Sequence, residues 1–362
     1  MDCIEYLGSS HYREADMNPT LIHPTKCRYL VFLPVRNGGE YIRFAINSVL
    51  AQSRSDWLMV VLENASSDDT LAIVESYSDP RIIVIPVKSG LGIEQNWARV
   101  YQVLSQGEIQ GQFATLIGHD DILYPSFLEA IETLYVRYPA VGLYQTSFDL
   151  IDQNDQYVRP CRPIPECETY IDFLATRGWG LRDSFGTGYV FRVDDYLRVG
   201  GIPNFPMLLF SDDLLFAYLA QEGGKVCTPE PHCAYRLHQA STSGSLSYKR
   251  SLAVVIALRK FLDHVRRDFP AYWNSPKGRA AIAALIAREV LIFKGPLLYW
   301  AFSLSGKEAL NALKTIYDDL SGGCPPNRWI AINSVVQWVY KFIRIVFWVT
   351  VFFRDRLINR LD

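Results

Sequence analysis

The chain has 362 residues, of which 49% are hydrophobic and 20% are charged, and its formal net charge is −2 at pH 7. This composition can bury a large core and excludes an intrinsically disordered chain. The near-zero net charge also argues against nonspecific binding to nucleic acid, which needs a basic surface.

The N-terminal residues and the cysteines bear on the cellular location. Residues 1–28 contain no basic stretch followed by an apolar one, so we interpret them as a lead-in and not as a secretory signal peptide. The seven cysteines are an odd number, and two pairs share a C-x5-C spacing that is unusual for zinc. We therefore expect reduced thiols and a cytoplasmic protein.

Short apolar runs alternate with amphipathic segments from residue 29 onward. The pattern predicts strands at 29–35, 57–63, 81–87 and 112–118, and helices at 40–52, 68–77, 92–105 and 125–137. This alternation predicts an α/β fold, with a mixed, mostly parallel sheet and helices on both faces. Ligands bind beyond the carboxyl ends of the strands in such sheets. The loops PVRNGG, ENASSDDT and GHDD each follow a strand, so we expect them to surround one crevice.

Residues 139–210 are less regular and rich in Pro, Gly, Tyr and Arg. We expect this stretch to be a substrate-facing insertion and not part of the sheet core. A helix is predicted to begin near Asp212, with Ser211 or Asp212 as its N-cap and Gly223 or Gly224 at its end.

Residues 246–362 are predicted to form a C-terminal helical region. The segment at about 329–353 lies in the most apolar part of the chain, but Lys341 and Arg344 interrupt it. A membrane-spanning helix needs about 20 largely uncharged residues. We therefore favour an amphipathic helix that lies on the membrane surface. A helix buried in an interface and a true membrane span stay open as alternatives.

Two loops carry side chains suited to a nucleotide. Asn37 lies in a turn whose two following glycines let the backbone approach a ligand closely. Glu63 and Asn64 offer an acceptor and an amide at the end of a strand, which suits a nucleobase edge or ribose hydroxyls. Ser66 and its neighbours can instead cap the next helix.

Two carboxylate pairs are candidates for chemistry. Asp120 and Asp121 offer hard oxygen ligands to a divalent cation that shares its shell with phosphates and water, although a solvated turn or a helix cap is the alternative. Asp212 and Asp213 offer a general base, although capping also explains them. His238 is a candidate to complete a metal shell or to contact a diphosphate. No P-loop, dinucleotide-binding glycine motif, nucleophile elbow or HExxH motif is present.

In this order the motifs resemble those of glycosyltransferase family 2, an inverting, nucleotide-sugar-dependent family with the GT-A fold. PVRNGGEYI, LENASSDDT, GHDDILYPSFLE, GTGYVFR and SDDLLFAYLAQEGG resemble its loop, acidic, D-x-D, acceptor-side and E-D segments, and together they cover residues 29–240. The chain departs from the pattern at Gly118, which replaces the first D-x-D aspartate, and at Ser211, which replaces the glutamate of the E-D pair. Glu63 and Asn64 stand where two aspartates are usual.

The resemblance implies roles for individual residues. It implies that Asp212 is the catalytic base, with Asp213 as the alternative, and that Asp120, Asp121 and His238 bind Mn²⁺ or Mg²⁺. Donor binding is implied for Pro34, Arg36, Asn37, Glu63, Asn64, Ser66, Asn96, His119, Asp120 and Arg236. Acceptor-side contacts are implied for Trp179, Gly186, Thr187 and Gly188.

The resemblance also implies a function. The expected enzyme is a hexosyltransferase-type glycosyltransferase that moves a sugar from a nucleotide-diphosphate sugar to a glycan or lipid-linked acceptor, in bacterial polysaccharide or O-antigen assembly. Residues 29–245 would form the catalytic domain, peripheral on the inner face of the cytoplasmic membrane. No nucleic-acid partner is expected, and a homo-oligomer stays open. The alternatives are a non-catalytic nucleotide-sugar-binding or scaffold subunit and a nucleotidyltransferase, whose glycine- and lysine-rich phosphate loop is missing here.

Overall fold

The computed structural model describes residues 25–238 and 248–291. The strands in these residues are β1 (Thr25–Val35), β2 (Trp57–Glu63), β3 (Ile82–Val84), β4 (Ile109–Leu116), β5 (Ile122–Leu123), β6 (Leu143–Ile151), β7 (Tyr157–Pro160), β8 (Cys167–Glu168), β9 (Tyr189–Arg192) and β10 (Lys225–Arg236). The helices are α1 (Ile42–Leu50), α2 (Thr70–Glu75), α3 (Ile93–Gln106), α4 (Phe127–Arg137), α5 (Tyr170–Trp179), α6 (Val193–Arg198), α7 (Ser211–Leu219), α8 (Tyr248–Asp268), α9 (Pro270–Asn274) and α10 (Pro276–Leu291), with a short 3-10 turn η2 (Pro206–Leu208) before α7.

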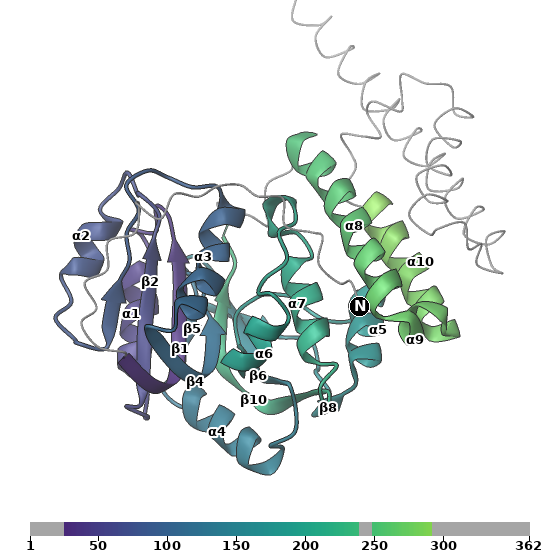
Figure 1. The fold of residues 1–362 in the computed structure, drawn as a ribbon, viewed down its shortest axis with the longest axis horizontal. Coiled ribbons are helices and arrows are strands. Elements are labelled where there is room, and N and C mark those ends of the chain that lie inside the picture. The colour runs from purple at the N-terminus through teal and green to yellow at the C-terminus, as the bar shows by residue number, and fades with distance from the viewer. Residues whose placement is uncertain (1–24, 239–247, 292–362) are drawn as a thin grey trace, which may run out of the picture. The chain divides into compact units, whose positions relative to one another are not determined.

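The strands form one sheet in the order β3-β2-β1-β4-β9-β6-β10-β5, with β7 beside β6 and β8 beside β10 (Figure 1). β1 pairs in parallel with β2 and β4, β2 with β3, and β6 with β10. Helical crossovers between the early strands favour this parallel pairing. β9 runs antiparallel between β4 and β6. The predicted mixed, mostly parallel sheet with flanking helices is thus confirmed.

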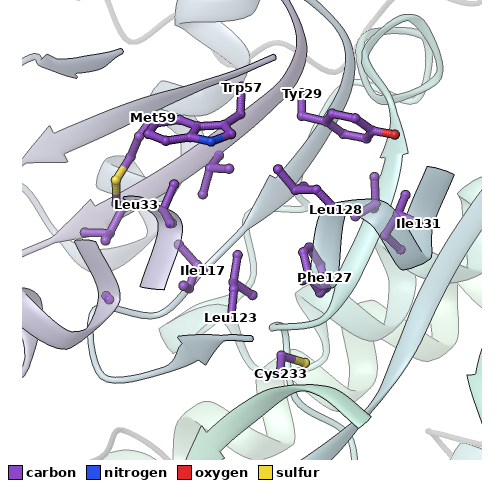
Figure 2. Packing of buried hydrophobic residues seen from close by; sticks show 14 of the residues in the cluster. Tyr29, Leu33, Trp57, Met59, Ile117, Leu123, Phe127, Leu128, Ile131 and Cys233 are labelled. Atoms are coloured by element: carbon purple, nitrogen blue, oxygen red, sulfur yellow. The ribbon is translucent and has the colours of Figure 1, made fainter. Parts of the chain in front are cut away.

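The side chains of β1 alternate between two buried faces of the sheet. Tyr29, Val31 and Leu33 belong to a cluster with buried residues of α1, α2 and α4. Figure 2 shows part of this cluster, in which side chains of β1 and β2 come together with those of α4. Leu30 and Phe32 are fully buried as well, on the face where α3 packs on β1 and β4. Both faces are therefore covered, and only the loops at the ends of the strands leave the sheet open.

Residues 139–210 contribute two central strands, so the expectation that this stretch lies outside the sheet core was wrong. β6 and β9 lie between β4 and β10, and Gln145, Thr146 and Ser147 of β6 are buried. Lys225 Nζ donates to Gln145 Oε1 (2.6 Å), and Ser147 Oγ donates to the carbonyl of Thr228 (2.9 Å). Hydrogen bonds offset most of the cost of burying such groups, so a polar sequence can form a core strand.

Helices α8 and α10 pack on elements of the predicted catalytic domain. α10 lies against α5, and α8 lies against η2 and α7 (Figure 1). Val254, Phe261, Ala281 and Leu285 from these two helices are buried. The amphipathic helix predicted at about 329–353 lies outside the described residues. Among the helices of the described residues, none has an uncharged apolar stretch that could span a bilayer.

Candidate active site

The loops after β1 and β2 are joined by hydrogen bonds at the carboxyl ends of these strands. The Asn37 N–H donates to Ser66 Oγ (2.9 Å), and the Ser67 N–H donates to Asn37 Oδ1 (2.8 Å). Asn37 has a left-handed backbone (φ 55°), a conformation that Asn adopts more easily than most residues. Pro34, at the end of β1, is buried. The two loops therefore lie at one edge of the sheet, as expected.

Glu63 and Asn64 use their polar atoms inside the protein. The buried Glu63 carboxylate accepts the N–H groups of Ala65 (3.0 Å) and Ser66 (2.7 Å). Asn64 makes two hydrogen bonds to the backbone of Leu91, one as donor (3.1 Å) and one as acceptor (2.7 Å). These two side chains shape the loops, and their predicted contact with a donor nucleotide stays a prediction.

Arg99 is a buried residue near these loops that the sequence motifs missed. Its guanidinium donates to the carbonyls of Glu63 (2.9 Å) and Ile85 and to Asn96 Oδ1 (2.9 Å). Burial lowers the pKa of Arg99 to about 10. Asn96, predicted to bind the donor, thus accepts a hydrogen bond from the buried Arg99 guanidinium. Arg36 is exposed, and its Nη1 lies 3.4 Å from the carbonyl oxygen of Leu91. Arg99 lies within an otherwise amphipathic helix, so its sequence context carried no signal that it would bind the carbonyls of Glu63 and Ile85.

Asp120 and His238 lie together after β4 and β10. His238 Nε2 lies 2.7 Å from Asp120 Oδ2, a hydrogen-bond distance. Asp120 Oδ1 accepts no hydrogen bond from the described residues, and it lies near Gly118. A Cβ at position 118 would lie 2.6 Å from Asp120 Oδ1 and 2.8 Å from Asp121 Oδ2, so the glycine leaves room for both carboxylates. His119 lies next to this pair, and burial lowers the pKa of its imidazole.

Asp121 is fully enclosed and is held on both of its oxygens. Oδ2 accepts the Thr187 hydroxyl, and Oδ1 accepts the Arg236 N–H (3.1 Å). Burial, with the nearby charge of Asp120, raises the pKa of Asp121 to about 7. Arg236 is also fully buried, donates from Nε to the Asp120 carbonyl (2.8 Å) and pairs with Asp155 (2.5 Å). Asp121 and Arg236 therefore use their polar groups to hold the loop after β4 against the end of β10 and the segment before β9.

The residues around Asp120 suit a divalent cation that is bound by only one or two protein ligands. In the described part of the chain, no group of three His, Cys, Asp or Glu side chains forms a ready metal cage. Asp120 nevertheless keeps one open carboxylate oxygen, with the His238 ring and the Asp121 carboxylate close by. Mg²⁺ and similar cations are often held by one or two carboxylates, with water and substrate phosphates completing the shell.

Asp212 and Asp213 have different environments at the start of α7. Asp213 is buried, and its oxygens accept Arg177 Nε (2.7 Å) and Ser184 Oγ (2.9 Å). Asp212 is half-buried, its Oδ1 accepts the Asp213 N–H (2.9 Å), and its Oδ2 accepts no hydrogen bond from the described residues. Burial, with the charge of Asp213, raises the pKa of Asp212 to about 7. Asp212 is thus the member of the pair with an available oxygen.

The backbone just before Asp212 is strained. Met207, Leu208 and Phe210 have φ values of 56°, 55° and 63°, which are costly for residues other than glycine. Glu94 Oε1 accepts the Met207 N–H (2.7 Å) and so helps to hold this turn. Strain of this kind is concentrated at functional sites, because the surrounding structure must enforce it.

One short segment joins the two carboxylate pairs. Ser184 binds Asp213, and Thr187 binds Asp121. These two residues are three positions apart, so the chain between them spans at most about 11 Å. The site around Asp120 and the site around Asp212 are therefore neighbours. Sequence reasoning named Thr187 but missed Ser184 and Arg177.

The other predicted acceptor-side residues lie on or after α5. Trp179, at the end of α5, is 39% exposed. A Cβ at Gly186 would meet no other atom within 4 Å, so the segment that joins the two sites has open space there. Gly188 is left-handed (φ 92°) and packs near the Cys233 sulfur. Trp179 and Gly186 are thus accessible, and their predicted contact with an acceptor stays a prediction.

Comparison with known proteins gives both a family and a fold. Residues 30–197 match the family model described as glycosyl transferase family 2. The putative teichuronic acid biosynthesis glycosyltransferase TuaG of Bacillus subtilis is 29% identical over 147 residues, which are 40% of this chain and 56% of that protein. An uncharacterized glycosyltransferase of Rickettsia prowazekii, RP339, is 28% identical over 134 residues, which are 37% of this chain and 40% of that protein. Each match thus spans less than two thirds of the relative's own length.

Solved structures share the fold at low sequence identity. S. aureus TarS 1–349 in complex with UDP-GlcNAc superposes with a TM-score of 0.58 and 14% identity, over 81% of each chain. TarS 1–349 alone gives a TM-score of 0.57 with the same identity and coverage. The mixed sheet with its flanking helices is therefore the GT-A fold that the motifs predicted. The match over residues 30–197 thus confirms the resemblance to glycosyl transferase family 2 that the motifs predicted.

Proposed function

We propose that this protein is an inverting glycosyltransferase of the hexosyltransferase type, which uses a nucleotide-diphosphate sugar as donor and a hydroxyl of a glycan or lipid-linked acceptor. One observation carries the proposal. Ser184 binds Asp213 and Thr187 binds Asp121, so one short segment contacts the neighbours of both Asp212, which has an open oxygen, and Asp120, which lies against His238. This supports a base at Asp212 close to a cation and diphosphate site at Asp120. A base next to a diphosphate site is what transfer from such a donor requires.

In the proposed reaction Asp212 takes the proton from the acceptor hydroxyl. The hydroxyl oxygen attacks the anomeric carbon, and the bond from that carbon to the diphosphate breaks with its electron pair leaving on the diphosphate. Attack from the opposite face inverts the anomeric configuration. A divalent cation bound by Asp120 and His238 would neutralise the charge on the leaving diphosphate. Asp213, paired with Arg177, fixes Asp212 through its N–H.

The donor and the biological setting are proposed by analogy. TarS has been solved in complex with UDP-GlcNAc, and TuaG is named for teichuronic acid biosynthesis. We propose a uridine-type donor as the first to test and bacterial polysaccharide or O-antigen assembly as the setting. We further propose that residues 29–245 form the catalytic domain and that the protein is peripheral on the inner face of the cytoplasmic membrane.

Replacing the proposed base will remove transfer. We expect Asp212→Asn to lower the rate of transfer by about 100-fold or more, because proton removal by a placed base contributes roughly that factor. Asp213→Asn will lower thermal stability, since it removes one of the charge pairs of the buried Arg177. Transfer is measured by product formation. Near-normal turnover in Asp212→Asn, with Asp213→Asn inactive, would move the base to Asp213, and donor binding without turnover in the wild type would favour a scaffold role.

The activity should rise with pH through neutrality. The pKa of Asp212 lies at about 7, well above the usual value for Asp, and only the ionised form accepts a proton. Below pH 7 we therefore expect kcat/KM to fall about tenfold per pH unit, and above it to level off. A pH–rate profile from pH 5.5 to 8.5 measures this. A profile that is flat between pH 5.5 and 7 would rule out a base of raised pKa.

The metal site can be tested without turnover. A ligand that binds only the folded protein raises its apparent stability. We expect UDP to raise the melting temperature more with Mn²⁺ than without it, and Asp120→Asn to abolish this difference. Asp149→Asn, which changes another partly buried carboxylate, is the control and should keep the difference. An Mn²⁺ effect that survives in Asp120→Asn would place the cation elsewhere.

Membrane attachment is proposed to depend on the C-terminal apolar segment. Removing residues 329–362 should release the protein from sedimented membrane vesicles, because the aromatic and basic residues of that segment would supply the attachment. Vesicle sedimentation of both forms checks this. If the shortened form still sediments with vesicles, the attachment site lies in the remainder of the chain.

A further inference from the structure

A chain of contacts leads from α10 to the proposed base. Glu289, which is 5% exposed, lies with its Oε1 3.7 Å from Arg177 Nη1. Arg177 Nε donates to Asp213 Oδ2 (2.7 Å), and the Asp213 N–H donates to Asp212 Oδ1 (2.9 Å). Two charged contacts and one backbone hydrogen bond thus connect α10 with the catalytic carboxylate. Glu289 itself does not appear in the family motifs, since they end near residue 240.

The contact between α5 and α10 is close enough to hold this chain in place. A Cβ at Gly178 would lie 2.7 Å from the Ala281 carbonyl oxygen and 2.9 Å from the Ala281 Cβ, so the two helices approach at their backbones. Arg288 donates to the carbonyls of Arg177 (3.2 Å) and Gly178 (3.3 Å), near the end of α5. The Arg288 guanidinium thus adds to the hydrogen bonds at the end of α5, where the Arg177 carbonyl also accepts the Gly180 N–H (3.1 Å). The position of Arg177 is therefore set by α10.

The charged groups that face Asp212 come from three helices. Asp213 lies on α7, Arg177 on α5 and Glu289 on α10, with Arg288 beside Glu289 at 3.2 Å. Other charged or titratable groups packed nearby are the buried Tyr189 of β9, the ion pair of Arg182 with Glu168, and His264 and Asp268 of α8, which bind Tyr218 further along α7. Three carboxylates thus surround Arg177, and Arg288 partly neutralises one of them.

The electrostatic effect of Glu289 on Arg177 has a definite direction. Burial by itself lowers the pKa of the Arg177 guanidinium, but the carboxylates of Asp213 and Glu289 outweigh it and raise the pKa above its usual value. Glu289 therefore competes with the α7 carboxylates for the same positive charge. Whatever positive potential Glu289 cancels is lost to Asp212.

We propose that Glu289 is a positioning residue for the transfer reaction, which holds Arg177 against Asp213 and limits how strongly Arg177 stabilises the ionised form of Asp212. α10 thereby sets the proton affinity of the base from outside the family motifs. The inference rests on the proposed function only for the role of Asp212 as the base.

Two substitutions on α10 should act in opposite directions. Glu289→Gln leaves Arg177 less neutralised, so the acidic limb of the pH–rate profile should move to lower pH by about half a unit. Arg288→Gln removes a neighbouring positive charge and frees Glu289 for Arg177, so the limb should move to higher pH. A mere loss of packing would not give opposite shifts, because it would move the pH–rate profiles of both variants in the same direction or leave both unchanged.

Asp172→Asn is the matched control. Asp172 pairs with Lys277 across the same two helices, near the other end of α5 and away from Asp212. This change also replaces an acid by its amide, and it should leave the pH–rate profile at the wild-type position. The inference is overturned if Glu289→Gln keeps the wild-type profile, if Glu289→Gln and Arg288→Gln shift in the same direction, or if Asp172→Asn shifts as much as Glu289→Gln.

A second readout separates this inference from the proposed function. Infrared titration of the Asp212 carboxyl, identified by its loss in Asp212→Asn, reports the protonation of this group without substrate. Opposite shifts in Glu289→Gln and Arg288→Gln, with no transfer by the wild type on any donor, would uphold the coupling and reject the transferase proposal. Unshifted titration alongside normal transfer would reject the coupling alone. If Glu289→Gln does not fold, as judged by thermal unfolding, the sign of the Arg288→Gln shift decides.

Discussion

The enclosed carboxylate of Asp121 is the contact on which the candidate site depends. It accepts the Thr187 hydroxyl and the Arg236 N–H, and so joins the end of β4 to the segment before β9 and to the end of β10. A carboxylate is tolerated in such a place only when hydrogen bonds replace its water. His238 follows Arg236 by two residues, and its Nε2 lies 2.7 Å from Asp120 Oδ2, next to this carboxylate. The pairing of β4 with β9 and of β5 with β10 brings these segments together, and Asp121 adds hydrogen bonds between them.

In each of the two Asp-Asp pairs, one carboxylate is fully hydrogen-bonded and the other keeps an open oxygen. Asp121 and Asp213 are buried and hydrogen-bonded on both oxygens, while Asp120 and Asp212 each keep one oxygen without a partner among the described residues. Adjacent identical residues thus receive different environments, which is how a protein assigns different roles to two carboxylates. The segment that includes Ser184 and Thr187 binds both of the buried members, so the two open members are held at neighbouring places.

Residue patterns predicted the elements that alternate regularly and missed those that do not. The strand predicted at 57–63 matches β2 residue for residue, and the helix predicted at 92–105 matches α3 to within a residue at each end. The predicted strand at 81–87 is shorter in the structure, where β3 covers Ile82–Val84. β6 was missed because its buried polar residues find their partners on β10, far along the chain. Periodicity cannot show partners that only the folded chain supplies.

The sequence by itself determined the α/β fold, the loops at the carboxyl ends of the strands and the two Asp-Asp pairs, because hydrophobic periodicity and local motifs are properties of neighbouring residues. Only the tertiary structure decided that Asp213 pairs with Arg177 while Asp212 keeps an oxygen, and that Glu63 and Asn64 bind the backbone. It also decided that Glu289 of α10 contacts Arg177, the partner of Asp213. These outcomes depend on burial and on charges brought together from distant segments, and burial and charge set which carboxylate stays available.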